Sequence, residues 1–267
     1  MNLGFSVCRL LTFQQVDNLP ESPTFMKIEN QMRVANRLLA SLPRTEYQRL
    51  SPNLESVSLA YGEILFEPGI AIKHVYFPND ALLSLLTVVD ETHALEVALV
   101  GREGMIGVAI ALGATNSHKR ATVQAAGMAM RMRVTLFRQE LKQNPALQRE
   151  VLRYTHTLMS QIAHTAACNR FHLIEARLAH RLLVTRDRVG SNHFTLTHEF
   201  LAQMLGVRRV GVTTAAHALK SRNLIDYSRG NIAILDGRGL EQAACSCYAF
   251  VKDIHGRIMV KPEIIPR

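Results

Sequence analysis

One segment of the sequence, residues 195–236, constrains the chain more than any other. Its first half carries two short apolar runs at helical spacing, separated by Gly206, where the chain can turn sharply. Thr197 can cap the first helix, because its hydroxyl accepts from an unpaired first-turn amide. Strand-like runs follow at 224–227 and 231–235. The segment predicts a helix-turn-helix followed by a two-stranded wing, an arrangement that reads DNA. An ordinary helical hairpin followed by a β-hairpin is the alternative.

The basic residues are concentrated in the same part of the chain. The sequence has 31 Lys and Arg against 22 Asp and Glu, a formal net charge of +9. Residues 170–267 contain 15 basic and 8 acidic side chains, whereas residues 1–169 contain 16 and 14. A basic C-terminal part joined to a nearly neutral N-terminal part favours a polyanionic partner for the C-terminal part.

The N-terminal half has the pattern of a small β domain. Short helical runs lie between residues 34 and 54. Strand-like apolar runs then follow one another over residues 57–134, separated by turn signals such as Pro68-Gly69. Many short strands at regular spacing are typical of an antiparallel barrel or jelly roll. We expect this β domain at residues 31–136, after a loosely ordered extension at residues 1–30.

A long amphipathic helix of about 25 residues is predicted next, because apolar residues recur at spacings of three and four. The stripe consists of Leu147, Val151, Tyr154, Leu158, Ile162 and Ala166. A stripe this narrow is typical of a coiled-coil seam. We expect it to form the interface of a homodimer; packing of the helix against its own barrel is the alternative.

Several classes of protein are excluded by what the sequence lacks. No apolar run approaches the ~20 residues that cross a bilayer, and no secretory signal pattern precedes residue 30. We therefore expect a cytoplasmic protein with reduced thiols and no membrane partner. Cys245 and Cys247 can supply two ligands of a metal site, but no second pair follows, so no metal is expected. No nucleophile–base arrangement, phosphate loop or HExxH motif is present, so the chain is not expected to be an enzyme.

The order of these parts resembles the Crp/Fnr family of bacterial transcription regulators over about residues 34–248. Gly62-x-Ile64-Leu65-x-x-Pro68-Gly69 is similar to the first barrel hairpin of the family, and Leu205–Thr213 is similar to its helix-turn-helix. The resemblance implies an α+β fold whose N-terminal antiparallel β-jelly roll is of the cyclic nucleotide-binding type. It also implies a long dimerisation helix, a winged helix-turn-helix and a C-terminal tail at residues 137–170, 171–248 and 249–267.

The resemblance also assigns DNA contacts. Arg209 falls on the principal guanine-reading arginine of the family, and an arginine fork matches guanine O6 and N7. Val210 stands where the family has a cytosine-reading glutamate, and Thr214 replaces a second reading arginine, so the DNA site should differ. Backbone or groove-edge positions remain for His198 and Arg229, with solvated surface as the alternative. The candidate DNA-binding residues are Thr197, His198, Glu199, Arg208, Arg209, Val210, Thr213, Thr214, His217, Ser228 and Arg229.

The expected ligand pocket departs from the cyclic-AMP-binding relatives. In those relatives a Gly-Glu-Leu-Gly turn binds the ribose hydroxyls, but here the turn contains Met105, which cannot accept from two hydroxyls. The phosphate-binding segment retains positive charge at Lys119 and Arg120, but its bidentate arrangement is altered. Cyclic AMP is therefore not expected; another small effector, or none, remains open. The candidate pocket residues are Gly104, Met105, Gly107, Lys119, Arg120 and Thr122.

These inferences together predict a homodimeric, sequence-specific transcription regulator that senses a signal in the barrel or the long helix. Its expected partners are double-stranded DNA with a pseudo-palindromic site, a second copy of the chain, and RNA polymerase. The alternative is a nucleotide-binding regulatory subunit without DNA binding. That alternative needs an intact phosphate-binding segment and has no need of Arg208 and Arg209, which is the opposite of what the sequence contains.

Overall fold

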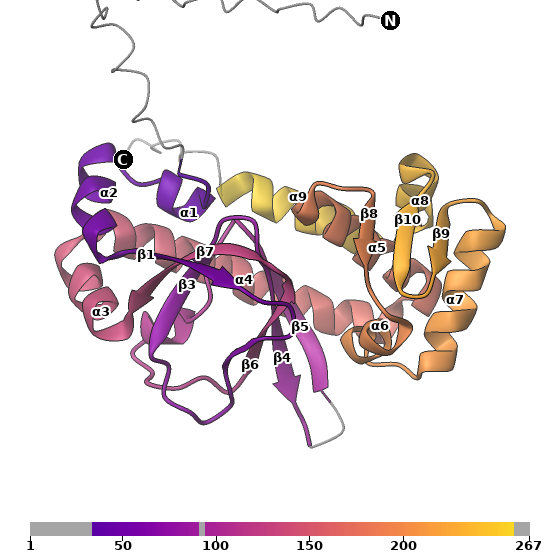
Figure 1. Ribbon diagram of the computed structural model, residues 1–267, viewed down its shortest axis with the longest axis horizontal. Helices are drawn as coiled ribbons and strands as arrows, with labels where there is room; N and C mark the ends of the chain where they lie inside the picture. Colours follow the sequence, from indigo (N-terminus) through magenta and orange to yellow (C-terminus); the bar gives the residue numbers. More distant parts are fainter. Residues whose placement is uncertain (1–33, 91–93, 259–267) are drawn as a thin grey trace, which may run out of the picture. The chain divides into compact units, whose positions relative to one another are not determined.

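The computed structural model describes residues 34–90 and 94–258 (Figure 1). The expected extension at residues 1–30 and the end of the expected tail lie outside these ranges. None of the helices in the described part is long and apolar enough to cross a membrane.

The N-terminal domain is an antiparallel β domain of two sheets, as predicted. One sheet has the order β1-β7-β3 and the other the order β2-β6-β4-β5, with antiparallel pairing throughout. The strands are β1 Glu55–Leu59, β2 Ile64–Phe66, β3 His74–Pro78, β4 Leu82–Val88, β5 Ala94–Val100, β6 Arg120–Ala125 and β7 Gly127–Arg133. Apolar side chains from both sheets, such as Phe77 and Leu83, pack into one core. The apolar residues of the strands are thus buried between the two sheets, as the strand-like runs in the sequence predict.

Short helices close the ends of this barrel. They are α1 Arg37–Ala40, α2 Arg44–Leu50, the 3-10 turns Ser51–Asn53 and Val108–Ile110, and α3 Val134–Gln143. Asn144 separates α3 from the next helix. Its side chain accepts from the Leu147 amide at 2.9 Å and caps that helix.

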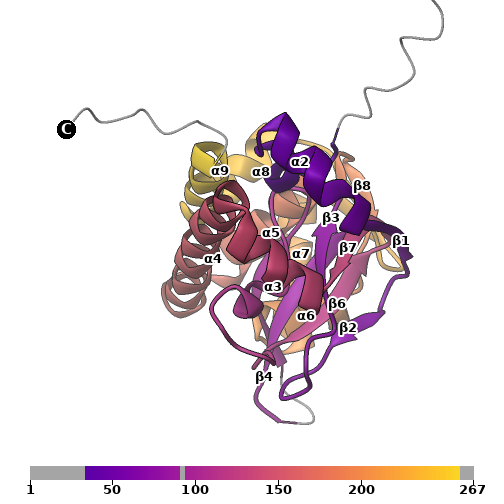
Figure 2. The same cartoon turned by 90° about the vertical axis from the view of Figure 1, so that its left-hand side faces the viewer.

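The long helix α4 runs from Pro145 to Phe171 and lies beside α3 against the barrel (Figure 2). The burial of its apolar stripe contradicts the prediction that this stripe forms a dimer seam. Leu147, Val151, Tyr154 and Leu158 are buried in the barrel's own core, and Ile162 packs partly against it. These residues therefore cannot form the seam between two subunits, because they already contact their own domain. Only Ala166 of the stripe is exposed.

The C-terminal domain is a winged helix with a second core. Its elements are α5 Ile174–Val189, β8 His193–Thr195, α6 His198–Leu205, α7 Arg209–Ser221, β9 Ile225–Ser228, β10 Asn231–Ile234, α8 Gly237–Ala243 and α9 Cys247–Ile258. The wing has a third strand, β8, which pairs with β10 and was not predicted. The expected tail is also partly helical. α9 packs on α4, where the rings of His164 and Phe250 stack at 3.9 Å.

Candidate nucleic-acid interface

The helix-turn-helix has the local geometry that its sequence predicts. Thr197 caps α6, with its hydroxyl oxygen 3.2 Å from the Phe200 amide. Gly206 ends α6 at φ +61°, a left-handed conformation that glycine adopts without strain. α7 begins at Arg209, and Arg208 is its N-cap residue. The turn therefore leaves both arginines at the exposed start of α7.

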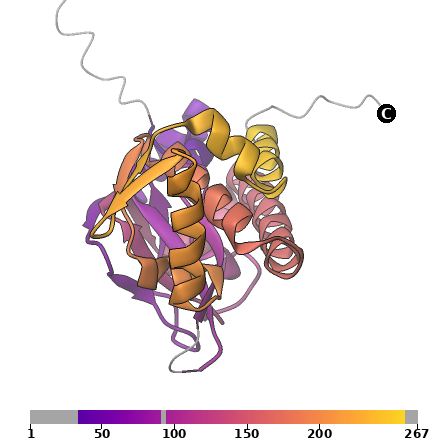
Figure 3. The same cartoon turned by 90° about the vertical axis from the view of Figure 1, so that its right-hand side faces the viewer.

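α7 lies at the front of the C-terminal domain in Figure 3. It has one buried face and one exposed face. Val212, Ala215, Ala216 and Leu219 are buried in the domain core. The opposite face is exposed, and Val210 there leaves 67% of its surface in solvent. That face carries Arg209, Val210, Thr213, Thr214 and His217. A mixed polar and aliphatic face that its own chain leaves open is suited to base edges in a major groove.

Two threonines on this face have their hydroxyls bonded back to the helix. Thr213 Oγ1 donates to the Arg209 carbonyl at 3.1 Å, and Thr214 Oγ1 donates to the Val210 carbonyl at 3.0 Å. Because a hydroxyl oxygen has two lone pairs, each can still accept from a base amino group. Both threonine hydroxyls therefore have their proton engaged and a lone pair free to accept a hydrogen bond.

His198 connects the start of α6 with α7 and the wing. Its Nδ1 lies 3.2 Å from Thr213 Oγ1, and its ring lies 4.8 Å from that of Tyr227. Partial burial, followed by the positive charge of Arg209, lowers the pKa of His198. The ring is therefore neutral at neutral pH in the free protein. It stands beside the α6 amides, the positive end of a helix dipole, where a phosphate is favoured.

The wing turn exposes a further arginine. Arg229 at φ +48° and Gly230 at φ +87° form the two-residue connection between β9 and β10. Both Ser228 and Arg229 are exposed there. Two positive φ values match the twist of a tight hairpin, and they present Arg229 at its tip.

The arginines of this domain fall into two groups. Four of them form ion pairs with carboxylates: Arg181, Arg186, Arg188 and Arg222. Arg177, Arg208, Arg209, Arg229 and Arg238 have no ion-pair partner among residues 34–90 and 94–258. Three of these, Arg208, Arg209 and Arg229, occupy the predicted DNA-contact positions, so their charge is available to a polyanion.

The helix-turn-helix also contacts the barrel. A Cβ at Gly206 would lie 2.7 Å from Leu95 of β5, so the turn approaches that strand closely. Glu199, Arg208 and Arg209 line a cleft of about 670 Å³ together with Leu95. The reading surface therefore begins beside the contact between the two domains.

The candidate ligand residues are mostly engaged within the chain. Met105 is completely buried, and a Cβ at Gly104 would overlap the ring of Tyr154 on α4. Gly107, at φ +95°, lies against Val75. The first segment of the expected pocket is therefore packed into the barrel core.

The second segment of the expected pocket is bonded to β2 and its neighbours. Arg120 Nε donates to both carboxylate oxygens of Glu67, at 2.8 and 3.0 Å, and Thr122 Oγ1 donates to the Glu63 carbonyl at 3.2 Å. The Lys119 amide donates to Ser117 Oγ at 3.0 Å. A ligand at these residues stays a prediction.

One group of residues was missed by sequence reasoning. Cys168 and His172, at the end of α4, meet Cys245 and Cys247. The hydrogen bond between the Cys168 and Cys245 sulfurs raises the pKa of Cys168 and lowers that of Cys245, because one thiol donates to the other. The signal in the sequence is weak, since the two pairs lie more than 70 residues apart.

Comparison with known proteins agrees with this geometry. Residues 176–243 match the family of the Crp-like helix-turn-helix domain. These residues include α6, α7 and both strands of the predicted wing. No curated protein sequence matches the chain.

Three solved structures illustrate the likeness of the whole fold. A protein described as a transcriptional regulator of the Crp/Fnr family from Eubacterium rectale is 18% identical, with a TM-score of 0.64 over 77% of this chain and 96% of its own. FixK2 from Bradyrhizobium japonicum is 11% identical, with a TM-score of 0.63 over 72% and 98%. A Crp-family transcriptional regulator from Thermus thermophilus is 20% identical, with a TM-score of 0.59 over 70% and 96%. The chain thus carries a Crp-like helix-turn-helix domain within the fold of the Crp/Fnr transcriptional regulators, which are not enzymes.

Proposed function

We propose that the protein is a homodimeric, sequence-specific transcription regulator that reads DNA with α7. The helix-turn-helix family and the fold support a DNA-binding transcription regulator. The observation that carries the finer proposal is the open face of α7, on which Arg209 has no carboxylate partner in the described part of the chain. A nucleotide-binding subunit without DNA binding has no need of this face.

The proposed reading of DNA divides the contacts into two kinds. Arg209 donates its fork to guanine O6 and N7, and Val210 contacts a thymine methyl group. Thr213 and Thr214 accept from base amino groups. The contacts of Arg229 and His198 are with phosphates, which position the domain but carry no sequence information.

The dimer is proposed on a different face of α4 from the one that the sequence stripe suggested. Residues at spacings of four and three lie on the exposed side of α4, and two of them are large: Leu152 is 45% exposed and Met159 is 63% exposed. The stripe is Leu152, His156, Met159, Ala163, Ala166 and Arg170. Alternating spacings of three and four are those of a coiled-coil seam, and alanines allow close approach of two helices. Ala166 is shared with the earlier prediction.

A signal is proposed to act through the contact between the barrel and the winged helix. Arg188 pairs with Glu103 of the barrel at 2.9 Å, and both side chains are 8% exposed. Arg181 pairs with Glu96 of β5. A change in the barrel that shifts these carboxylates would reorient the two recognition helices, which makes a two-state device. We do not expect cyclic AMP to be the signal, because Met105 and Arg120 are engaged elsewhere.

The test is selection of duplexes from a random pool by the full-length protein. We expect a two-fold symmetric motif with half-site centres about 10 base pairs apart. Arg209→Ala should lose enrichment at a guanine position. Arg44→Ala, which removes the same charge from exposed α2, is the control and should select the same motif. Enrichment of no motif, or of the same motif by Arg209→Ala, would contradict the proposal.

A further inference from the structure

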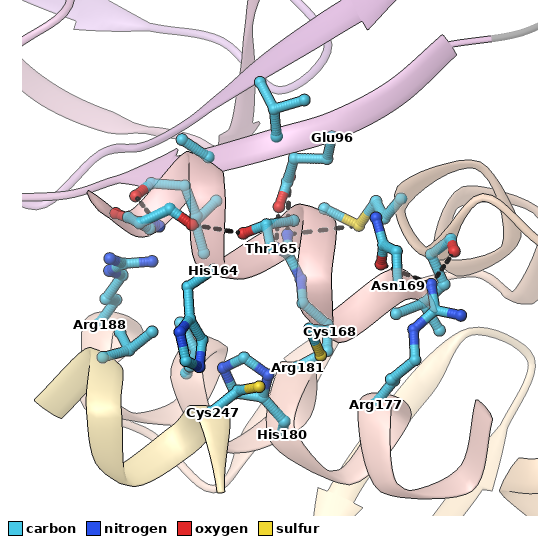
Figure 4. A pocket seen from close by; sticks show the side chains of 18 residues that line it. Glu96, His164, Thr165, Cys168, Asn169, Arg177, His180, Arg181, Arg188 and Cys247 are labelled. Atoms are coloured by element: carbon cyan, nitrogen blue, oxygen red, sulfur yellow. Dashed lines mark hydrogen bonds and ion pairs between the residues drawn. The ribbon is translucent and has the colours of Figure 1, made fainter. Parts of the chain in front are cut away.

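Three buried cysteines and one histidine meet where α4 ends. Cys168 lies in the last turn of α4, and His172 caps its end. Cys245 lies between α8 and α9, and Cys247 is the first residue of α9. The three cysteines are 5%, 7% and 1% exposed, in sequence order. One ligand atom from each of the four residues lies within 4.8 Å of all the others. Cys168 and Cys247 also line a cavity beside the hinge between α4 and α5 (Figure 4).

We propose that these four side chains bind a single Zn²⁺ ion. Three cysteines and one histidine are a common donor set of closed, tetrahedral structural zinc sites. With Zn–S and Zn–N bonds of about 2.3 and 2.0 Å, tetrahedral geometry places two sulfurs about 3.8 Å apart and a sulfur and a nitrogen about 3.5 Å apart. The Cys168 and Cys245 sulfurs are 3.6 Å apart, and Cys247 Sγ lies 3.4 Å from His172 Nδ1. Both separations lie within about 0.2 Å of the corresponding edges of such a tetrahedron.

Backbone hydrogen bonds hold the four ligands in place. The His172 amide donates to the Cys168 carbonyl at 3.1 Å, and the extended conformation of His172 ends α4. The Cys245 amide donates to the Ala176 carbonyl at 3.3 Å, which fixes the second segment to the start of α5. The Tyr248 amide donates to the Cys245 carbonyl at 3.0 Å and starts α9. The ligands are therefore positioned by the main chain of both segments.

The donor set favours one ion over the other uses of clustered cysteines. A Cys168–Cys245 disulfide would use two of the four groups and leave Cys247 and His172 with no common role. An iron–sulfur cluster places its thiolates on different iron atoms, which spreads the sulfurs more widely than around one ion. The three thiols also form a small cluster of their own, separate from both large cores.

The position of the site points to what a bound ion would do. Asn169, next to Cys168, accepts from Arg177 Nη2 at 2.7 Å. The same guanidinium donates to the Leu205 carbonyl, one residue before the Gly206 turn. An ion at the cysteines would clamp the hinge between α4 and α5, and this hydrogen-bonded chain leads from the hinge to the helix-turn-helix. Loss of the ion would loosen the orientation of the DNA-binding domain.

Metal analysis of the full-length protein, purified under reducing conditions after zinc supply and dialysis, tests the site. We expect one Zn²⁺ per chain. Cys168→Ser and Cys247→Ser should lose the ion, because each removes one thiolate. Cys8→Ser is the matched control: it changes the remaining cysteine of the sequence, outside the described residues, and should retain the ion. His172→Cys should also retain it, as a four-cysteine site.

Cobalt substitution gives a second readout that does not depend on DNA binding. Co²⁺ in the wild-type protein should show a thiolate charge-transfer band and the ligand-field bands of a tetrahedral site. His172→Cys should strengthen the charge-transfer band, because it adds a thiolate. Metal-free wild-type protein with a Cys168–Cys245 disulfide or three free thiols would overturn the proposal. So would zinc that persists in both serine variants. If the serine variants fail to fold, loss of the ion from His172→Cys would still contradict it.

Discussion

Arg181 on α5 and Glu96 on β5 form a buried ion pair that joins the winged helix to the barrel. Arg181 Nη2 lies 2.9 Å from Glu96 Oε2 and donates to Gln124 Oε1 at 2.6 Å, while Ser84 Oγ donates to Glu96 at 2.6 Å. The two charged side chains are 10% and 6% exposed. Burial lowers the pKa of Arg181, and Glu96 opposes that shift. Such pairs add little net stability, because desolvation offsets their attraction.

Glu96→Gln should therefore be strongly destabilising, because it leaves the charge of Arg181 buried without a partner. Breaking one side of a buried pair costs about 3–5 kcal/mol. Replacing both partners, with Glu96→Leu and Arg181→Met together, should recover most of this loss. Urea unfolding measures the free energies.

The control for this experiment is an exposed pair in the barrel. Glu55 accepts from Arg131 at 2.9 Å and is largely open to solvent, so Glu55→Gln should change the free energy of unfolding little. Equal effects of the Glu96 and Glu55 variants would show that the two domains do not dock through Glu96 in solution.

A glutamate at Met159 and a glutamate at Leu158, neighbours on α4, should have different effects on the protein. Met159→Glu places a carboxylate in the proposed seam and should give folded monomers that lose specific DNA binding. Leu158→Glu places the same charge in the barrel core, where Leu158 is 4% exposed, and should unfold the domain. Light scattering with circular dichroism separates the two outcomes. A Met159→Glu protein that remains dimeric would place the interface elsewhere.

The burial of the α4 stripe in its own barrel shows what a periodic apolar pattern can and cannot predict. The spacing of Leu147, Val151 and Leu158 correctly indicates a helix with one apolar face. It does not say which surface covers that face, since a barrel and a second helix both bury leucines. The smaller exposed stripe around Met159 was hidden by the stronger one. By contrast, the helix-turn-helix was predictable because its cap, its glycine turn and its amphipathic faces are all local signals.

Features that depend on distant contacts could not be predicted in the same way. Cys168 and Cys245 come together only through tertiary packing, in which α9 packs on α4 and α8 packs on α5. Arg181 and Glu96 would each be expected at the surface, because the pairing that allows their burial joins two domains. β8 has only three residues, too few for an alternating pattern. Local sequence carries local structure, and these features are not local.

Cyclic AMP at millimolar concentration should leave the thermal unfolding of the protein unchanged. A ligand at 100 times its dissociation constant would stabilise the folded state by about 2.7 kcal/mol and raise the melting temperature. No such gain is expected, because Met105 is buried and Arg120 is already held by both oxygens of Glu67. Stabilisation of the wild type would show that the pocket was misread. Stabilisation of Glu67→Gln alone would show that Glu67 withholds Arg120 from the phosphate.

DNA affinity should increase as the pH falls below neutrality, through His198. Burial and Arg209 lower the pKa of this imidazole in the free protein. A phosphate beside it would favour the imidazolium, so the pKa rises in the complex and binding takes up a proton. Affinity therefore grows as the pH falls from the bound pKa toward the free one. Fluorescence anisotropy from pH 8 to pH 6 should show this trend, and His198→Gln should reduce it. His217→Gln is the control, and an unchanged slope in His198→Gln would remove His198 from the phosphate contacts.

Arg209→Ala and Arg229→Ala should weaken DNA binding in different ways. Arg209 is proposed to form a bidentate base contact worth about 1–3 kcal/mol, so its loss should affect the selected site strongly and random duplexes weakly. Arg229 stands at the wing tip and is proposed to contact phosphate alone. Its loss should weaken both kinds of duplex about equally and reduce the salt slope by about one unit. Competition binding at two salt concentrations distinguishes the cases. If Arg209→Ala weakens random and selected duplexes equally, Arg209 is a backbone contact, and the reading face of α7 must be assigned to other residues.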